Sequence, residues 1–312
     1  MNHYLSIKDI DNLDDWVTQA KELKKQPKAY KKIGEDKTIC LLFFNNSLRT
    51  RLSTQKAALN LGLEVMVMNF GSEGWALEYE DGTVMNQNTS EHIKEAAQVV
   101  SQFCDIVAIR AFASLTDKEK DEAEVVLNGF KKYTSIPVVN MESSVGHPLQ
   151  ALADAITIDE QNTKPKPKVV LSWAPHPKAL PHAVANSFVE MMQLQDANFV
   201  ITHPKGYELN KNITKDIPVE YDQNKAMEGA DFVYVKNWSS YVDYGKVLNH
   251  DTNWMMTKEK LGHAKFMHCL PVRRNVVVED AVLDSDQSLV VEQANNRTYA
   301  AQIVLKKILE SL

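Results

Sequence analysis

The segment Ser-Leu-Arg-Thr-Arg at residues 47–51 places two hydroxyl groups and two guanidinium groups close together. It follows the apolar run 38–44 and opens a helix-period stretch, 48–61, that ends at Gly62. Ser47 is a favoured N-cap residue, and the free N–H groups of a first helical turn bind anions. Arginine adds paired donors that suit phosphate oxygens. The pattern predicts an anion site. The alternative is a capped helix with solvated arginines, but positive charges at a helix N-terminus interact unfavourably with the helix dipole.

A second group of polar residues, Glu142, His147 and Gln150, follows the apolar run 137–140. Pro148 suits the first position of a helix, and the dipole at a helix start favours a neutral imidazole. A neutral His147 could donate one hydrogen bond to a carbonyl oxygen. The alternative, an ordinary core histidine, is weakened by the neighbouring carboxylate and amide.

Basic or aromatic residues mark four further segments. They are Arg110 after the apolar run 105–109, Lys236 after the run 231–235, His176 within the proline-rich stretch 173–181, and Trp75 within a glycine-containing loop. An arginine at a strand end can also snorkel to solvent, and ordinary loop composition could account for the lysine and the histidine. Exposed aromatic residues in loops are often interface residues, which is one interpretation of Trp75. The alternative is that Trp75 packs into a small hydrophobic cluster beside the main core.

A thiol follows the last of the central apolar runs, in His-Cys-Leu-Pro at 268–271. Arg273 and Arg274 stand nearby, and positive charge lowers the pKa of a thiol, so a nucleophilic Cys269 is one interpretation. No Cys–His–Asn arrangement accompanies it, which disfavours covalent catalysis.

These residues require a scaffold that brings strand ends together. The expected strands are 38–44, 64–69, 105–109, 137–140, 168–173, 198–202, 231–235, 265–267 and 288–291, and the expected helices lie near 48–61, 90–103, 117–133, 149–159, 182–194, 224–228 and 296–309. Alternating strands and helices predict an α/β fold with parallel sheets flanked by helices. In such sheets ligands bind outside the carboxyl ends of strands, where most of the residues above lie.

The length of 312 residues favours two domains, which we place at 1–147 and 148–295, with the helix of 296–312 packing back on the first. A net charge of −6 argues against a nucleic-acid or anionic-membrane partner. The three cysteines are widely spaced, which indicates a reducing cytoplasm, no disulfide framework and no metal site. No leader, bilayer-spanning run or glycine-rich nucleotide loop is expected.

Three of these segments together resemble motifs of one family, the transcarbamylases. Residues 47–51 are similar to the family's Ser-x-Arg-Thr-Arg carbamoyl phosphate motif, residues 147–154 to its His-Pro-x-Gln…Ala-Asp segment, and residues 268–271 to its His-Cys-Leu-Pro motif. They occur in the family's order and span nearly the whole chain. The resemblance implies a carbamoyl phosphate-binding first domain, an amino-acid-binding second domain and no cofactor.

Within the family, the chain resembles the branch that uses N-acylated ornithine. Ornithine carbamoyltransferases carry a Ser-Met-Gly loop, whereas this chain has Lys-Asn-Trp-Ser-Ser at 236–240. The branch implies a homotrimer with active sites at subunit contacts, and a deep trefoil knot in the second domain. Val277 stands where acetyl-branch enzymes carry a modifiable lysine, so that modification is expected to be absent.

One position separates the two acyl specificities of this branch. The acetyl branch carries Glu there and the succinyl branch carries Pro, whereas Ser90 matches neither. A glutamate would repel a succinyl carboxylate, and the small neutral Ser90 removes that repulsion and leaves space. The residue therefore favours N-succinylornithine as substrate.

The resemblance implies transfer of the carbamoyl group of carbamoyl phosphate to the δ-amine of an N-acylornithine, in arginine biosynthesis. The implied carbamoyl phosphate ligands are Ser47, Leu48, Arg49, Thr50, Trp75 from a neighbouring subunit, Arg110, His147, Gln150, Cys269, Leu270 and Arg297 at the start of the last helix, with Thr50, Arg110, His147 and Cys269 as the catalytic set. The implied acylornithine ligands are Ser90, Glu142, His176, Lys236 and Arg273, with Arg274 as the alternative to Arg273. The competing functions are N-acetylornithine or ornithine carbamoylation, and a non-catalytic anion-binding paralogue.

Overall fold

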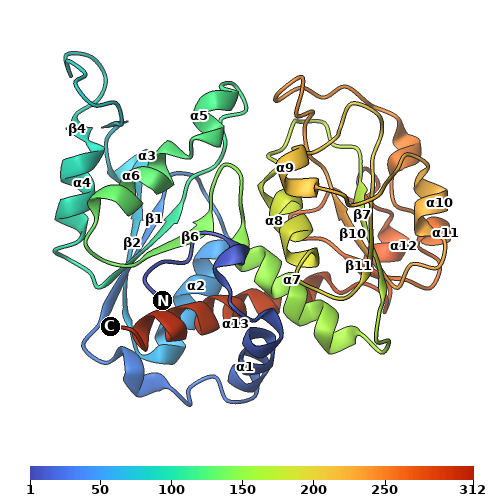
Figure 1. The fold of residues 1–312 in the computed structure, drawn as a ribbon, viewed down its shortest axis with the longest axis horizontal. Helices are drawn as coiled ribbons and strands as arrows, with labels where there is room; N and C mark the ends of the chain where they lie inside the picture. The colour runs from blue at the N-terminus through green and yellow to red at the C-terminus, as the bar shows by residue number, and fades with distance from the viewer. The chain divides into compact units, whose positions relative to one another are not determined.

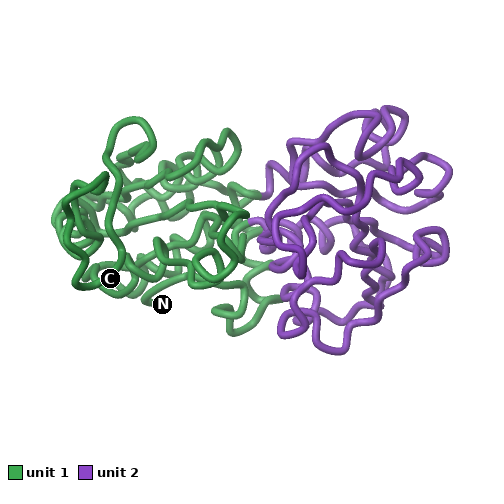
Figure 2. Tube along the Cα trace, turned by 90° about the horizontal axis from the view of Figure 1, so that it is seen from above, with its two compact units in different colours: residues 1–149, 297–312 green, residues 150–296 purple.

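The computed structural model describes all 312 residues, which divide into two compact units. Unit 1 comprises Met1–Leu149 and Arg297–Leu312, and unit 2 comprises Gln150–Asn296 (Figure 2). Two helices, α7 (Pro148–Gln161) and α13 (Val290–Leu309), contain the points at which the chain passes from one unit to the other. Both chain ends lie in unit 1, where the Ser311 hydroxyl donates to the Met1 carbonyl at 2.9 Å.

Unit 1 is built on a four-stranded parallel sheet with the strand order β2-β1-β5-β6. Its strands are β1 (Thr38–Phe43), β2 (Glu64–Asn69), β5 (Ile106–Arg110) and β6 (Val138–Glu142). Its helices are α1 (Leu13–Lys25), α2 (Arg49–Leu61), α3 (Phe70–Glu73), α4 (Ile93–Val100), α5 (Lys118–Glu122), α6 (Val125–Tyr133) and the end of α13, with 3-10 turns at Ile7–Asp9 and Lys31–Gly34. A separate parallel pair joins β3 (Leu77–Glu78) to β4 (Glu91–His92).

Helices cover both faces of this sheet. On one face, Ile93 of α4 and Phe130 of α6 belong to the same buried cluster as Leu42 and Ile109 of the strands. On the other face, α2 and α13 lie side by side (Figure 1), and Asn60 donates to Gln302 at 3.0 Å. The sheet is therefore buried as the apolar runs of β1, β5 and β6 require.

Unit 2 contains a five-stranded parallel sheet with the strand order β11-β10-β7-β8-β9. Its strands are β7 (Lys168–Trp173), β8 (Asn198–Thr202), β9 (Val219–Glu220), β10 (Phe232–Lys236) and β11 (Lys265–Met267). Its helices are most of α7, α8 (Ala183–Met192), α9 (Lys211–Thr214), α10 (Gln223–Met227), α11 (Lys258–Leu261), α12 (Asp280–Leu283) and the start of α13, with a 3-10 turn at Thr252–Trp254.

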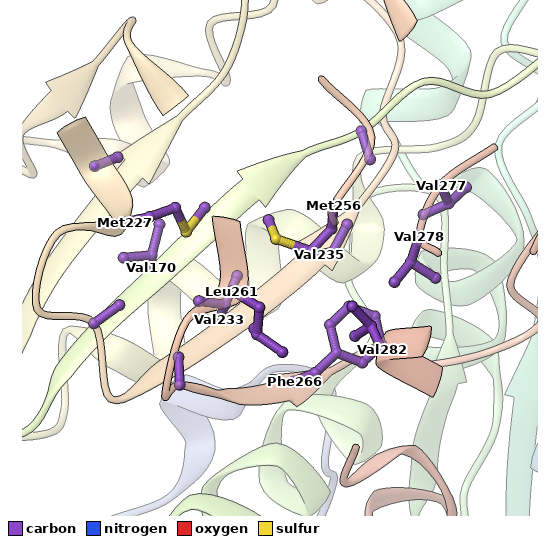
Figure 3. Close-up of a cluster of buried hydrophobic side chains, with 14 of the residues drawn as sticks. Val170, Met227, Val233, Val235, Met256, Leu261, Phe266, Val277, Val278 and Val282 are labelled. Carbon is purple, nitrogen blue, oxygen red and sulfur yellow. The ribbon is translucent and has the colours of Figure 1, made fainter. Parts of the chain in front are cut away.

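The side chains of neighbouring residues in β10 point to opposite faces of the unit 2 sheet, as the pleat of a strand requires. Val233 packs into a cluster with Met227, Leu261 and Val282 from the helices α10, α11 and α12 (Figure 3). The ring of Tyr234 instead lies 4.3 Å from that of Phe188 in α8. Apolar side chains on both faces explain why this strand is an unbroken apolar run.

The predicted fold class is confirmed, since both sheets are parallel and flanked by helices. The strands expected at 64–69, 168–173, 198–202 and 265–267 have those bounds in the structure. The three cysteines are buried and form no disulfide, and none of the helices combines the length and apolar character needed to cross a bilayer.

Several expected elements differ. The helix expected over 117–133 is two helices, α5 and α6, because Glu124 between them adopts a left-handed conformation with φ 46°. The stretch 90–103 begins with β4, and its helix ends at Val100. The predicted strand 288–291 is wrong, since α13 begins at Val290. As a consequence, Arg297 lies inside the last helix and not at its start.

The apolar face of α2 also differs from the expectation of a simple amphipathic helix. Leu48, Leu52 and Leu59 are exposed, whereas Thr50 and Thr54 are buried. Apart from Leu61, the side of α2 that faces the interior of unit 1 is therefore made of small and polar residues. Helix α1, with its buried Trp16, was not among the expected helices.

Candidate active site

The loop between β1 and α2 forms the predicted anion site of unit 1. Helix α2 begins at Arg49 with Leu48 at the N-cap, so the expectation of Ser47 as N-cap is wrong by one residue. The Ser47 hydroxyl nevertheless accepts a hydrogen bond from Thr50 N at 3.3 Å. Gly62 ends the helix in the left-handed conformation, with φ 87°. The N–H groups of the first turn and the Arg49 side chain are thus set at the end of a buried strand.

The second arginine of this segment supports the loop. The Arg51 guanidinium donates to Asn69 Oδ1 at 2.8 Å and lies 5.3 Å from the centre of the Phe43 ring. Asn69 is in turn held by the Glu73 carboxylate through its backbone and side-chain nitrogens. Arg51 therefore ties the start of α2 to the end of β2.

Arg110 and Glu142 form a buried ion pair at the ends of β5 and β6. Arg110 Nε and Nη2 lie 3.1 and 3.0 Å from Glu142 Oε2. Arg110 Nη1 donates to the carbonyls of Asn45 and Asn46, in the loop before α2. Arg110 is only 5% exposed, so the snorkelling alternative is wrong. Its guanidinium joins two strand ends to the anion loop.

His147 and Arg297 complete this group of side chains. Arg297 Nη2 donates to Thr50 Oγ1 at 2.6 Å and lies 3.3 Å from His147 Nε2, which is 3.4 Å from Glu142 Oε2. Because a guanidinium can only donate, Nε2 accepts from it in the tautomer that carries the ring proton on Nδ1.

We call Thr50, Arg110, Glu142, His147 and Arg297 the unit 1 polar cluster; all five are buried. They come from α2, β5, β6, the segment before α7, and α13. The cluster holds two guanidinium groups and one carboxylate, and Arg49 stands beside Thr50 in the chain. The excess positive charge suits a bound anion, because buried charges need partners.

Unit 2 contains a second group of basic side chains, Lys236, His176 and Arg273, which we call the unit 2 basic cluster. Lys236 ends β10 and is 9% exposed, and its ammonium group makes no hydrogen bond or ion pair with another side chain. Arg273 Nε donates to His176 Nε2 at 3.1 Å and has no carboxylate partner. The cluster thus holds two cations that no carboxylate of the chain neutralises.

The electrostatics of His176 fit this arrangement. Burial lowers the pKa of His176, and the charges of Arg273 and Lys236 lower it further, against the opposing hydrogen bond to the Lys178 carbonyl. The neutral ring donates from Nδ1 to that carbonyl at 2.8 Å and accepts from Arg273 on Nε2. By contrast, Arg274 is paired with Asp280 and Asp284, so Arg273 is the better placed of the two arginines to receive a ligand carboxylate.

The His-Cys-Leu-Pro turn follows β11 in unit 2. Cys269 is buried, Leu270 adopts a positive φ of 57°, and its N–H donates to His268 Nδ1 at 2.8 Å. The turn offers its backbone carbonyls as hydrogen-bond acceptors. Gln150, at the unit 2 end of the boundary in α7, has a buried Oε1 without a partner.

Trp75 and Ser90 lie together in unit 1, near the β3–β4 pair. The Trp75 side chain is exposed, and its indole N–H donates to Glu91 Oε2 at 2.8 Å. Ser90, also exposed, donates its backbone N–H to the Ala76 carbonyl at 3.0 Å. Glu91 was not predicted as a functional residue, because no motif or spacing marks it. No group of His, Cys, Asp or Glu side chains in the chain could hold a metal ion.

Two family models match the chain. Residues 2–160 match the aspartate/ornithine carbamoyltransferase carbamoyl-P binding domain, and residues 181–308 match the Asp/Orn binding domain of the same family. The chain belongs to the aspartate/ornithine carbamoyltransferase family. The resemblance seen in the three motifs is confirmed, and the protein is a carbamoyltransferase-family enzyme.

Individual relatives place this carbamoyltransferase near the N-acylornithine enzymes. It is 47% identical to the N-succinylornithine carbamoyltransferase of Bacteroides thetaiotaomicron, over 100% of both chains. It is 33% identical to the N-acetylornithine carbamoyltransferase of Xanthomonas campestris pv. campestris, over 98% of this chain and 97% of that one.

A solved relative adds structural similarity. It is a glutamate-to-serine variant of N-acetyl-L-ornithine transcarbamylase, complexed with carbamyl phosphate and N-succinyl-L-norvaline. It superposes with a TM-score of 0.91 at 32% identity, covering 98% of this chain and 99% of that one.

Proposed function

We propose that this carbamoyltransferase converts carbamoyl phosphate and N-succinyl-L-ornithine into N-succinyl-L-citrulline and phosphate, a step of arginine biosynthesis. The observation that carries the acceptor assignment is the unit 2 basic cluster, in which Lys236 and Arg273 lack carboxylate partners. N-succinylornithine brings two carboxylates, whereas N-acetylornithine brings one. The 47% identity to an N-succinylornithine carbamoyltransferase supports the same choice.

In this mechanism unit 1 binds carbamoyl phosphate. The phosphate lies at the first turn of α2, held by the Ser47–Thr50 backbone and the Arg49 side chain. Thr50, Arg110 and His147 donate to the carbonyl oxygen as it gains negative charge, and Arg297 adds positive charge. Glu142 keeps Arg110 in place and contributes to acylornithine binding. Trp75 reaches the site of a neighbouring copy and covers the ligand there.

The acceptor is bound through unit 2. Lys236 pairs with the α-carboxylate, and Arg273, held by His176, pairs with the succinyl carboxylate. Gln150 and the backbone carbonyls of Cys269 and Leu270 accept from the carbamoyl amine. The neutral δ-amine attacks the carbamoyl carbon and forms the new carbon–nitrogen bond. The carbon–oxygen bond to phosphate breaks, and the amine proton passes to the departing phosphate. Fixed donors and positioning supply the rate acceleration, with no cofactor.

We further propose the assembly and topology that the family resemblance implies: a homotrimer with active sites at subunit contacts, and a knotted unit 2. The knot rests on the resemblance. The end of β7 and the segment after it contact the segment after β10, the neighbouring strand. Trp173 donates to the Trp238 carbonyl at 2.9 Å, and Ser239 N donates to the Leu180 carbonyl at 2.9 Å. The domain bounds 1–147 and 148–295, and the cytoplasmic location, stay predictions.

The substrate assignment is tested by citrulline formation from carbamoyl phosphate with N-succinylornithine, N-acetylornithine and ornithine offered in parallel. We expect the largest kcat/KM with N-succinylornithine. We expect Ser90→Glu to lower this value and to raise the relative value for N-acetylornithine, because a carboxylate there repels the succinyl group. A wild-type preference for N-acetylornithine, or an unchanged ratio in the variant, would contradict the assignment. Lack of turnover with all three amines would favour the non-catalytic alternative.

A further inference from the structure

Asp154 and Gln293 form a fully buried bridge inside unit 2. Gln293 Nε2 donates to Asp154 Oδ1 at 2.7 Å, and Gln293 Oε1 accepts from His268 N at 3.0 Å. The same oxygen of Asp154 accepts from Gln150 Nε2 at 2.7 Å. Gln293 and Asp154 both have 0% exposure. The bridge therefore links Gln150 in α7, through α13, to the first residue of the turn after β11.

The hydrogen bonds of this bridge fix the orientation of the Gln150 amide. A carboxylate only accepts hydrogen bonds, so Asp154 requires the Gln150 amide to present its nitrogen. The amide oxygen of Gln150 is then turned to the other side, where it is buried and has no partner in the chain. Leaving a buried acceptor unpaired is costly, so its orientation suits a ligand that donates. The donor in carbamoyl phosphate is its NH₂ group.

Gln293 has a matching constraint. Its oxygen receives the backbone N–H of His268, and its nitrogen faces the carboxylate, so only an amide can make both bonds. A glutamate of the same shape would set a second carboxylate against Asp154. The amide thereby holds the Cys269–Leu270 turn at a set place relative to Gln150.

We propose that Asp154 and Gln293 are positioning residues for recognition of the carbamoyl amine. They set the orientation of the Gln150 amide and the position of the Cys269–Leu270 turn. The amide oxygen and the backbone carbonyls of the turn are therefore in place before the ligand binds. The inference rests on the proposed function for the identity of the ligand. The alternative is that the bridge only stabilises unit 2.

The test uses Gln293→Glu and the double variant Asp154→Asn with Gln293→Glu. The single variant places two buried carboxylates together, and we expect a lower thermal midpoint and a KM for carbamoyl phosphate raised about tenfold or more. In the double variant, the amide introduced at position 154 donates to the new carboxylate, which restores the midpoint. Gln150 must then turn its oxygen toward the same amide, so its nitrogen faces the ligand and the KM stays high.

Inorganic phosphate provides the second measurement, because it lacks the amine. Its inhibition constant should stay within about twofold of wild type in both variants. A matched control is Gln302→Glu, in the same helix, which loses a partly buried bond to the Pro27 carbonyl. That variant should lower the midpoint without changing the KM for carbamoyl phosphate.

Recovery of both the midpoint and the KM in the double variant would show a purely structural bridge and overturn the proposal. If the double variant does not fold, the Gln293→Glu variant is measured at low temperature. An equal rise of its KM for carbamoyl phosphate and its phosphate inhibition constant would overturn the proposal. A rise of the KM alone would support it. A wild-type enzyme inactive on all amines would refute the proposed function instead. Equilibrium competition between phosphate and carbamoyl phosphate would still test the bridge.

Discussion

At the scale of single residues, the partners of an arginine show whether its charge is already balanced within the chain. Arg110 and Arg274 are paired with carboxylates, whereas Arg273 is held by a neutral histidine. An arginine held by a neutral acceptor is fixed in place and keeps its charge for a ligand. The sequence shows where arginines stand but not which carboxylate reaches them, since Arg110 and Glu142 are 32 positions apart.

His176 should give the KM for N-succinylornithine a pH dependence. Its pKa lies below the ordinary value of 6.5, mainly through burial, so the ring is neutral at neutral pH and accepts from Arg273. As the pH falls through this lowered pKa, the ring gains a proton, loses the acceptor on Nε2 and repels Arg273 and Lys236. We expect the KM to rise on the acidic side of 6.5, as measured by initial rates.

The control for this prediction is His176→Gln, which keeps an acceptor for Arg273 but does not titrate. Protonation of the substrate δ-amine affects wild type and variant alike, so the ratio of their KM values isolates the histidine. A ratio that stays constant between pH 5.5 and 7.5, about one unit either side of 6.5, would refute the role assigned to His176.

At the scale of elements, β7 is predicted with its bounds unchanged, because it is a mainly apolar run whose residues after Lys168 are all buried. The failures are positions where one backbone conformation or tertiary packing decides. Glu124 divides an otherwise continuous helical pattern, and Val290 and Val291 are typical strand residues but begin α13. Gln293 was missed for a related reason: its partner Asp154 is 139 positions away, and no local pattern records that bond.

Gly62, at the end of α2, should be intolerant of a side chain. Its φ is +87°, and an added Cβ would meet the Lys31 carbonyl oxygen at 2.0 Å. We expect Gly62→Ala to lower the free energy of unfolding by about 2–4 kcal/mol, from left-handed strain plus the clash. Gly82 is the matched control, because its φ is +82° but nothing lies within 4 Å of its Cβ position. Gly82→Ala should cost only the strain, about 1 kcal/mol; equal losses in urea unfolding would contradict the clash.

At the scale of the whole molecule, the net charge of −6 conceals a different local distribution. The unit 1 polar cluster has two guanidinium groups for one carboxylate, and the unit 2 basic cluster has two cations without one. The anionic groups of carbamoyl phosphate and N-succinylornithine would supply the missing negative charge. The net charge of the chain therefore does not indicate the charge of the proposed ligands.

The proposed trimer makes a quantitative prediction about shared sites. Trp75 is exposed in the single chain, with its indole held by Glu91, and is proposed to act on a neighbouring copy. Arg49 is proposed to act within its own copy. Trp75→Ala and Arg49→Ala should each be nearly inactive when pure. In a randomly reassembled equal mixture, a site is intact when its own Arg49 and the neighbour's Trp75 are both present, which recovers about a quarter of wild-type activity.

The outcome of mixing separates the possible assemblies. If Trp75 acted within its own copy, every site of a mixed trimer would carry one of the two defects, and mixing would restore nothing. The variants are dissociated together in mild denaturant, reassembled by dilution and assayed at equal total protein. Mixing without the dissociation step is the control, since intact trimers of either variant hold only defective sites. Recovery only after joint reassembly would establish that one copy's tryptophan completes another copy's site, and that the exposed position of Trp75 is needed for catalysis.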